Sequence, residues 1–167
     1  MQNFDRLVVT SRGFTLVELM VVVAIIGIFA VVAAPYTAAW RQDADVRAAS
    51  STLELAYGKA KALALRNPGQ GYETSAGVKE VASGIKMENA TLMVCTGEPT
   101  AAGCTVGGAA VVWSGDLPDG IAVTVNNVQL SSLGLDNTGQ SIDADGDPIL
   151  LTYIATKGAK SHDSELR

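Results

Sequence analysis

The first long feature of the sequence is an apolar run close to its N-terminus. Within Phe14–Ala34 only Thr15 and Glu18 are clearly polar. A helix over this run would be about 30 Å long, which matches the hydrocarbon core of a bilayer. Arg6 and Arg12 precede the run, and the positive-inside rule then keeps the N-terminus in the cytoplasm. The pattern predicts a single membrane-spanning helix followed by an exported domain.

Beyond Pro35 the apolar residues continue at spacings of three and four, which is typical of an amphipathic helix. The motif Asn67-Pro68-Gly69 ends this pattern, because proline cannot continue a helix and the other two residues favour its C-terminal cap. The apolar stripe consists of Val46, Ala49, Leu53, Tyr57, Ala60 and Leu63 or Ala64. We predict one helix from Phe14 to about Arg66, whose second half, residues 35–66, packs on a head.

Residues 67–167 change to short β-prone runs separated by Gly, Asn and Asp. Asn126-Asn127 lies between two of these runs and could form a tight turn. The candidate strands are Val78–Val81, Gly84–Met87, Thr91–Cys95, Ala109–Trp113, Ile121–Val125, Val128–Leu133 and Ile149–Ala155. The predicted fold class is α+β, with a long N-terminal helix packed on a C-terminal antiparallel β-sheet or small β-sandwich.

Charge limits the classes of partner. The chain has a formal net charge of −5, and removal of residues 1–13 would leave −6 because that segment holds one net positive charge. An acidic surface opposes binding to nucleic acid or to anionic lipid without a local basic site.

Two ordinary explanations of the apolar run leave one residue unexplained. A secretory signal peptide has a shorter apolar region, and cleavage after Ala34 would place Pro35 directly behind the cut. A plain single-span anchor has the right length. Neither alternative accounts for the carboxyl group of Glu18 inside the run.

The residues from Gly13 to Glu18 read GFTLVE and lead into the apolar run. This string resembles the processing motif of type IV prepilins and type II secretion pseudopilins. The resemblance implies that residues 1–13 are a leader, that prepilin peptidase cuts between Gly13 and Phe14, and that Phe14 is then N-methylated. It also implies a type IV pilin fold in which Phe14–Ala34 is the transmembrane or filament-core segment. A helix kink at Pro35 is common in this family.

The same resemblance implies the partners and the location of the protein. The partners would be other pilins or pseudopilins in a helical filament, prepilin peptidase, and an inner-membrane assembly platform. The protein would lie in the bacterial inner membrane with its head in the periplasm, and in a pilus or pseudopilus after assembly.

Glu18 also has a physical reason to act in assembly. A carboxylate inside an apolar helix costs about 2.5–3.5 kcal/mol on insertion scales, and no basic residue lies between Phe14 and Trp40. Cleavage would create a cationic amine at Phe14. In a filament of staggered parallel helices, Glu18 of one subunit could pair with that amine on a neighbour and fix the axial register.

Cys95 and Cys104 are the two cysteines of the chain. In a domain outside the cytoplasm, two cysteines with eight residues between them favour a disulfide over two buried thiols. A zinc site is disfavoured because no second cysteine pair or nearby histidine completes four ligands.

Other candidate chemistry is sparse. Asp143, Asp145 and Asp147 could offer oxygen ligands to Ca²⁺, but their spacing does not fit the twelve-residue calcium loop, and a hairpin turn is the alternative. His162 is the single histidine, with Ser161 and Asp163 beside it in what reads as a solvated polar tail. Neighbours in sequence do not make a catalytic triad. We therefore expect neither an enzyme nor a resident cofactor.

The head is similar to a minor-subunit group that includes the H-type pseudopilin of type II secretion (GspH) and FimT-type minor pilins. The residues that carry this similarity are Leu92-Met93-Val94-Cys95, Cys104, Trp113, Gly115, Leu135-Asp136 and Gly139. The expected function is a minor pilin or minor pseudopilin, a structural subunit in filament assembly or priming for protein secretion or pilus function.

The alternative is a FimT-like DNA-binding minor pilin for natural transformation. That subgroup carries an arginine-rich C-terminal motif. Here Lys157, Lys160 and Arg167 are interrupted by Asp163 and Glu165, so we do not expect nucleic acid as a partner.

Overall fold

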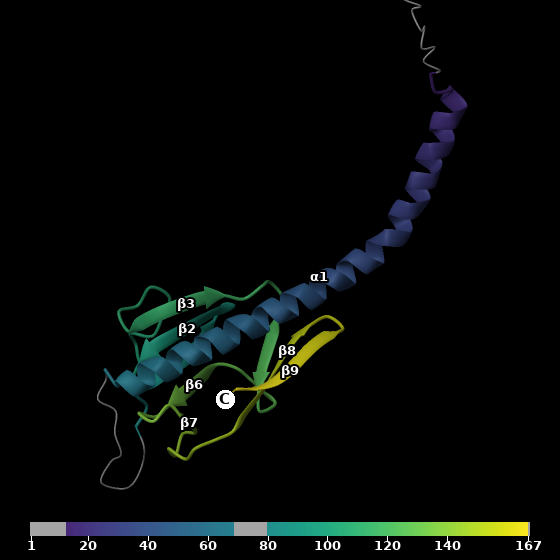
Figure 1. The fold of residues 1–167 in the computed structure, drawn as a ribbon. Coiled ribbons are helices and arrows are strands. Elements are labelled where there is room, and N and C mark those ends of the chain that lie inside the picture. The colour runs from purple at the N-terminus through teal and green to yellow at the C-terminus, as the bar shows by residue number, and fades with distance from the viewer. Residues whose placement is uncertain (1–12, 69–79, 167) are drawn as a thin grey trace, which may run out of the picture. The chain divides into compact units, whose positions relative to one another are not determined.

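The computed structural model describes residues 13–68 and 80–166 (Figure 1). The chain divides into two units, Met1–Ala38 and Ala39–Arg167. One helix, α1 (Leu16–Arg66), contributes to both units, and all the strands belong to the second. The second unit is the head.

Helix α1 begins and ends at residues with capping roles. The backbone N–H of Glu18 donates to Thr15 Oγ1 at 3.2 Å, so Thr15 is the N-cap. At the other end, Asn67 adopts a φ of 44° and its N–H donates to the carbonyl oxygens of Leu63 and Ala64, which is a left-handed C-cap. The single long helix is confirmed with its predicted end at Arg66, and it begins at Leu16, two residues after the predicted start at Phe14.

The head contains two sheets in which every strand pair is antiparallel (Figure 1). The five-stranded sheet has the order β3-β2-β1-β6-β7 and the four-stranded sheet the order β5-β4-β8-β9. The strands are β1 (Ser83–Glu88), β2 (Thr91–Thr96), β3 (Val111–Asp116), β4 (Ala122–Val125), β5 (Val128–Gln129), β6 (Ser132–Leu135), β7 (Ser141–Ile142), β8 (Leu151–Lys157) and β9 (Lys160–Leu166).

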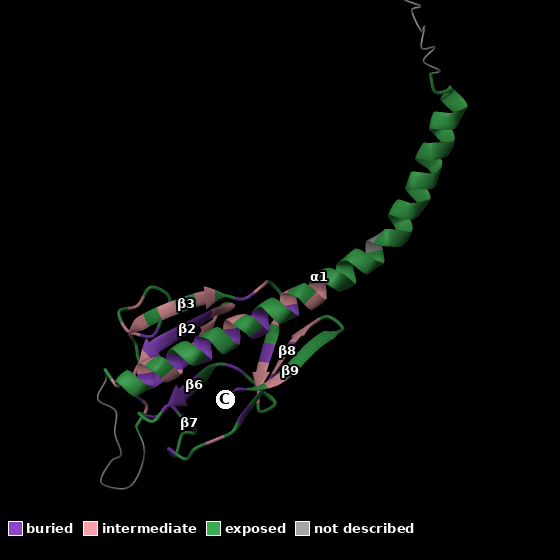
Figure 2. Ribbon diagram, viewed as in Figure 1, coloured by how far each residue is buried: buried purple, intermediate pink, exposed green. Residues whose placement is uncertain are grey.

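One core joins α1 to both sheets. The predicted stripe is buried, and Ser50 and Ala56 extend it; Figure 2 shows the buried positions along this half of the helix. The stripe packs with Ile85 and Leu92 of one sheet and with Val123 and Tyr153 of the other. Four of its members are alanines, whose small side chains let the helix backbone lie close to the sheets.

Polar contacts also fix the second half of α1 on the head. Tyr153 Oη donates to Glu54 Oε1 at 2.8 Å, and Lys157 Nζ lies 2.8 Å from Asp45 Oδ2. Burial of the ring, followed by the bond to Glu54, raises the pKa of Tyr153 to about 12. The head therefore holds this part of the helix through buried apolar area and through specific hydrogen bonds.

The α+β class, with a long helix packed on antiparallel sheets, is confirmed and is consistent with the type IV pilin fold. The tight turn at Asn126-Asn127 is also present: both residues have positive φ, and Val125 pairs with Val128 across them. Such a two-residue turn suits Asn because its side chain tolerates the left-handed region.

Two strand predictions and one tail prediction were wrong in detail. The run Val128–Leu133 contains parts of two strands in different sheets, since β5 pairs with β4 and β6 pairs with β1. Residues 160–166 form the paired strand β9 and are not a tail. Of the predicted strand Val78–Val81, Glu80 and Val81 are not in a strand, and its other two residues lie outside the described part of the chain.

Candidate processing and assembly site

The proposed cleavage position lies just before α1. Gly13, Phe14 and Thr15 are outside the helix and exposed, and Phe14 retains 86% of its accessible surface. Residues in an exposed non-helical segment can be extended into a protease without first breaking helical hydrogen bonds. The bond between Gly13 and Phe14 is therefore placed where a peptidase can reach it.

Glu18 lies in the first turn of α1, three residues after the N-cap Thr15. This spacing is that of a capping box, and the positive end of the helix dipole favours a carboxylate there. The role of Thr15 was missed at the sequence level, although the pattern Thr-x-x-Glu before an apolar run could have indicated it. Phe14 and Glu18 thus lie four residues apart at one helix terminus, and both are exposed.

The helix that follows has an apolar surface on all sides. Every large apolar side chain from Leu16 to Val32 is at least 47% exposed. The most apolar 18-residue window has a mean hydropathy of 2.9 and no buried residue, so α1 is long and apolar enough to cross a membrane by length and composition. The sequence and this helix are consistent with a single-pass anchor in the inner membrane.

Pro35 lies inside α1. It has no N–H to donate to the carbonyl oxygen of Val31, which favours a local bend. The kink itself stays a prediction.

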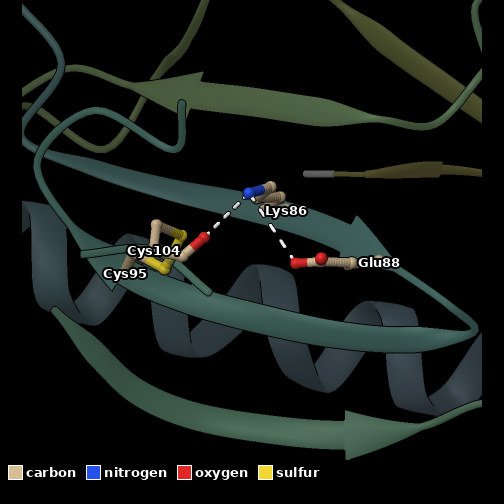
Figure 3. Close-up of a disulfide and its surroundings, with 4 residues drawn as sticks. All are labelled: Lys86, Glu88, Cys95 and Cys104. Carbon is tan, nitrogen blue, oxygen red and sulfur yellow. Dashed lines mark hydrogen bonds and ion pairs between the residues drawn. A yellow bond between two sulfur atoms is a disulfide. The ribbon is translucent and has the colours of Figure 1, made fainter. Parts of the chain in front are cut away.

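The disulfide between Cys95 and Cys104 is present, with a Cα–Cα distance of 5.7 Å. Both cysteines are fully buried in a small second core with Met93. Figure 3 shows Lys86 beside the bridge: its Nζ donates to the carbonyl oxygen of Cys104 at 2.9 Å and lies 3.8 Å from Glu88 Oε2. The bridge and this lysine fasten the loop between β2 and β3 to the sheet.

Trp113 and Gly115 form one structural unit on β3. A Cβ added to Gly115 would lie 2.5 Å from the Trp113 ring and 3.3 Å from the Thr52 side chain. The indole therefore occupies the space that a side chain at position 115 would need. Lys59 Nζ lies 5.9 Å from the centroid of the same ring, within range of a cation–π contact.

Asp136 and Asp143 organise two turns of the same kind, seven residues apart. In each, Oδ1 of the aspartate accepts backbone N–H groups two and four residues later, and a glycine at the fourth position has positive φ. Asp136 is fully buried and also accepts from Thr138 Oγ1 at 2.7 Å. This role of Asp136 was not predicted, although the repeated pattern Asp-x-x-Gly indicates it.

The second of these turns contains the calcium candidates. Asp143 Oδ1 accepts the N–H groups of Asp145 at 3.0 Å and Asp147 at 2.9 Å, so this carboxylate has a structural partner already. Within residues 13–68 and 80–166, no three His, Cys, Asp or Glu side chains gather as a metal site.

His162 lies on β9 opposite Ala155. Successive residues of a strand point to opposite faces, so Ser161 and Asp163 point away from the histidine ring. Lys157, one of the C-terminal basic residues, is held by Asp45 and by the carbonyl oxygen of Asp119.

Comparison with known families finds one match. Residues 10–34 match the model of the prokaryotic N-terminal methylation motif. The matched segment contains the cleavage position, Glu18 and the apolar part of α1, and it supports a pilin-like protein that is processed by prepilin peptidase and assembles with other pilins. No solved structure matches the chain significantly.

Proposed function

We propose that this chain is a minor pilin or minor pseudopilin, a non-enzymatic subunit of a type IV pilus or a type II secretion pseudopilus. One observation carries the proposal: the methylation motif over residues 10–34 coincides with an exposed peptide bond directly before an apolar helix. A peptidase substrate, a membrane anchor and a filament-core helix all need this arrangement.

The apolar half of α1 would serve the subunit twice. Before assembly it holds the subunit in the inner membrane by contact with lipid. In the filament the same side chains would pack against helices of neighbouring subunits, which replaces lipid by protein at little cost in apolar contact. All the large apolar side chains from Leu16 to Val32 are exposed on the subunit. Each of them can therefore exchange a lipid contact for a contact with a neighbouring helix when the subunit leaves the bilayer.

Processing would make Glu18 useful rather than costly. Removal of residues 1–13 leaves a cationic amine at Phe14, and in a dry core an isolated carboxylate needs such a partner. Pairing Glu18 of one subunit with the Phe14 amine of its neighbour satisfies both groups at one axial spacing only. The pair would therefore set the register of the filament.

Features of the head support the minor-subunit group. The residues that suggested it have structural roles: Cys95 and Cys104 close a loop, Gly115 accommodates Trp113, and Asp136 organises a turn. No contact among the described residues favours the DNA-binding alternative, since Lys157 is paired with Asp45.

Co-expression with prepilin peptidase tests the proposal. The native chain should be converted to a shorter form, and Gly13→Val should block conversion because the enlarged side chain stands at the cut. Gly27→Ala is the matched control: it changes a glycine of the same segment with no atom within 4 Å of the added Cβ, and its processing should be normal. Processing of Gly13→Val at the native rate would contradict the proposal.

A further inference from the structure

The stretch of α1 that follows the apolar run carries a tryptophan that its own head does not cover. Trp40 is 78% exposed, and no side chain from residue 35 to residue 45 is buried. Figure 2 shows that the buried positions of the helix begin only where it runs along the sheets. The indole of Trp40 is therefore open to a partner outside this chain.

The helical spacing explains why the head leaves Trp40 uncovered. Ala49, nine residues further along, is fully buried in the core that joins α1 to the sheets. Nine residues are about two and a half turns of an α-helix, so Trp40 and Ala49 lie on opposite faces. The face that holds Trp40 points away from the head, and packing on the head is excluded as the role of this ring.

The position of Trp40 along the chain suits the surface of a bilayer. The apolar run ends at residue 34, and the next six helical residues rise about 9 Å, which a bend at Pro35 can only shorten. The polar layer on each side of the hydrocarbon core is about 5–7 Å thick. Helical side chains tilt toward the N-terminus of their helix, so the ring of Trp40 reaches back toward the run. The indole therefore falls at the level of the lipid headgroups.

The chemistry of the exposed aromatic side chains fits this layer. An indole has an apolar ring and one N–H donor, and this combination enriches tryptophan and tyrosine at membrane interfaces. Tyr36, two residues after the run, is a second aromatic with a polar end and is 75% exposed. Contacts between membrane helices favour small residues instead. Lipid therefore fits Trp40 better than a neighbouring helix does.

The charged residues beside Trp40 are compatible with a lipid surface. Asp43 and Asp45 each have a cationic partner within the chain, which reduces their repulsion of anionic headgroups. Arg41 is exposed, and no carboxylate within residues 13–68 and 80–166 forms an ion pair with it. Its guanidinium can bind a lipid phosphate.

We infer that Trp40 is an interfacial anchor whose indole lies among phospholipid headgroups at the outer end of the membrane span. It fixes how far the helix enters the bilayer, because sinking would bury its N–H in hydrocarbon and rising would expose its ring to water. The inference names a lipid surface as the partner of this residue. It rests on the proposed function, in which residues 14–34 span the membrane before assembly.

Tryptophan fluorescence of the full-length chain in phospholipid vesicles tests the anchor. The chain has two tryptophans, so Trp113→Phe leaves Trp40 as the single emitting indole. The vesicles contain phosphatidylcholine that is brominated either near the headgroup or near the ends of the acyl chains, and bromine quenches only nearby indoles. We expect the shallow bromines to lower the emission of Trp40 about twofold and the deep bromines to lower it much less.

Two matched variants serve as controls. Trp40→Phe leaves Trp113, whose ring lies over Gly115 in the head, and neither bromine position should quench it. Ile26→Trp, combined with Trp40→Phe and Trp113→Phe, places the single indole within the span at a side chain that is 61% exposed. The deep bromines should quench this indole most strongly.

Three outcomes would overturn the inference. Trp40 could be quenched by neither bromine position while Ile26→Trp is quenched, which would leave the ring to a neighbouring subunit. Trp40 could be quenched more by the deep bromines, which would place it inside the hydrocarbon. Trp113 could be quenched as strongly as Trp40, which would place the whole head on the lipid. In each case quenching of Ile26→Trp by the deep bromines shows that the span and the proposed function stand; its absence would remove the span, the proposed function and this inference together.

Discussion

The two aspartate turns of the head allow one perturbation with a built-in comparison. Asp136→Ala and Asp143→Ala remove the same acceptor from the same kind of turn. In both turns the aspartate N–H also donates to the carbonyl oxygen four residues later, at 2.8 Å from Asp136 to Gln140 and 3.0 Å from Asp143 to Asp147. The turns differ in burial, since Asp136 is fully buried and Asp143 is exposed.

The expected magnitudes follow from that difference. The Asp136 carboxylate accepts three hydrogen bonds at 2.9, 2.7 and 2.9 Å, and its loss leaves their donors without this acceptor. A hydrogen bond to a charged group contributes about 1.5–3 kcal/mol to stability, and bonds to one group are not additive. We therefore expect Asp136→Ala to lower the free energy of unfolding by about 3–5 kcal/mol. In Asp143→Ala water replaces the exposed acceptor, and we expect the free energy of unfolding to fall by only about 0.5–1 kcal/mol.

Thermal unfolding of the full-length chain in detergent, followed by near-ultraviolet circular dichroism, measures both losses. Asp136→Ala should lower Tm by about 10–20 °C, and Asp143→Ala by no more than about 4 °C. Asp136→Asn keeps an acceptor oxygen of the same size, so its Tm should lie between those of the native chain and of Asp136→Ala. Equal shifts for the two alanine variants would refute the argument that burial sets the strength of these turns.

Three further predictions concern the disulfide, Tyr153 and Glu18. Cys95→Ala combined with Cys104→Ala should lower the free energy of unfolding in urea by about 2.5–3 kcal/mol, and reduction of the native chain should have the same effect. Tyr153→Phe should cost about 1–2 kcal/mol at neutral pH. Folding raises the pKa of Tyr153 from 10.0 to about 12. The stability that this phenol provides is therefore complete below pH 10 and is lost as the pH rises toward 12. The difference in Tm between the native chain and Tyr153→Phe should shrink over that range. Glu18→Gln keeps the shape of the side chain and removes its charge; it should leave cleavage intact and reduce incorporation into filaments, and incorporation at the native level would count against the pairing with the Phe14 amine.

Much of the helix could be predicted from the sequence because its signals are local. The apolar run, the stripe from Val46 to Ala64 and the stop at Asn67 depend on neighbours within a turn or two of helix. The turn at Asn126-Asn127 is local for the same reason.

The sheet pairing depends on residues that are distant in sequence, and the predictions failed there. β9 reads KSHDSEL, a polar composition typical of a tail. It becomes a strand because β8 offers a complete antiparallel ladder to pair with. The run Val128–Leu133 looks like one strand, yet the chain leaves one sheet at Leu130 and enters the other at Ser132.

The proposed processing motif is easier to recognise from the sequence than a contact inside the head. Gly13, Phe14 and Glu18 belong to one short contiguous motif, which on the proposed function a peptidase would read in sequence order. A hollow of the head is lined by Lys59 and Arg66 from α1 and by Val112 and Trp113 from β3, residues that only the fold brings together. Spacing along the chain carries no signal for such a site.

The central claim is that the mature polypeptide begins at Phe14. Mass spectrometry of the N-terminal peptide from the native protein, isolated from membranes or filaments, measures this directly. The account predicts a peptide that starts with Phe14 and carries one extra methyl group on its amine. A peptide that starts at Met1, or one that starts after Ala34, would contradict it.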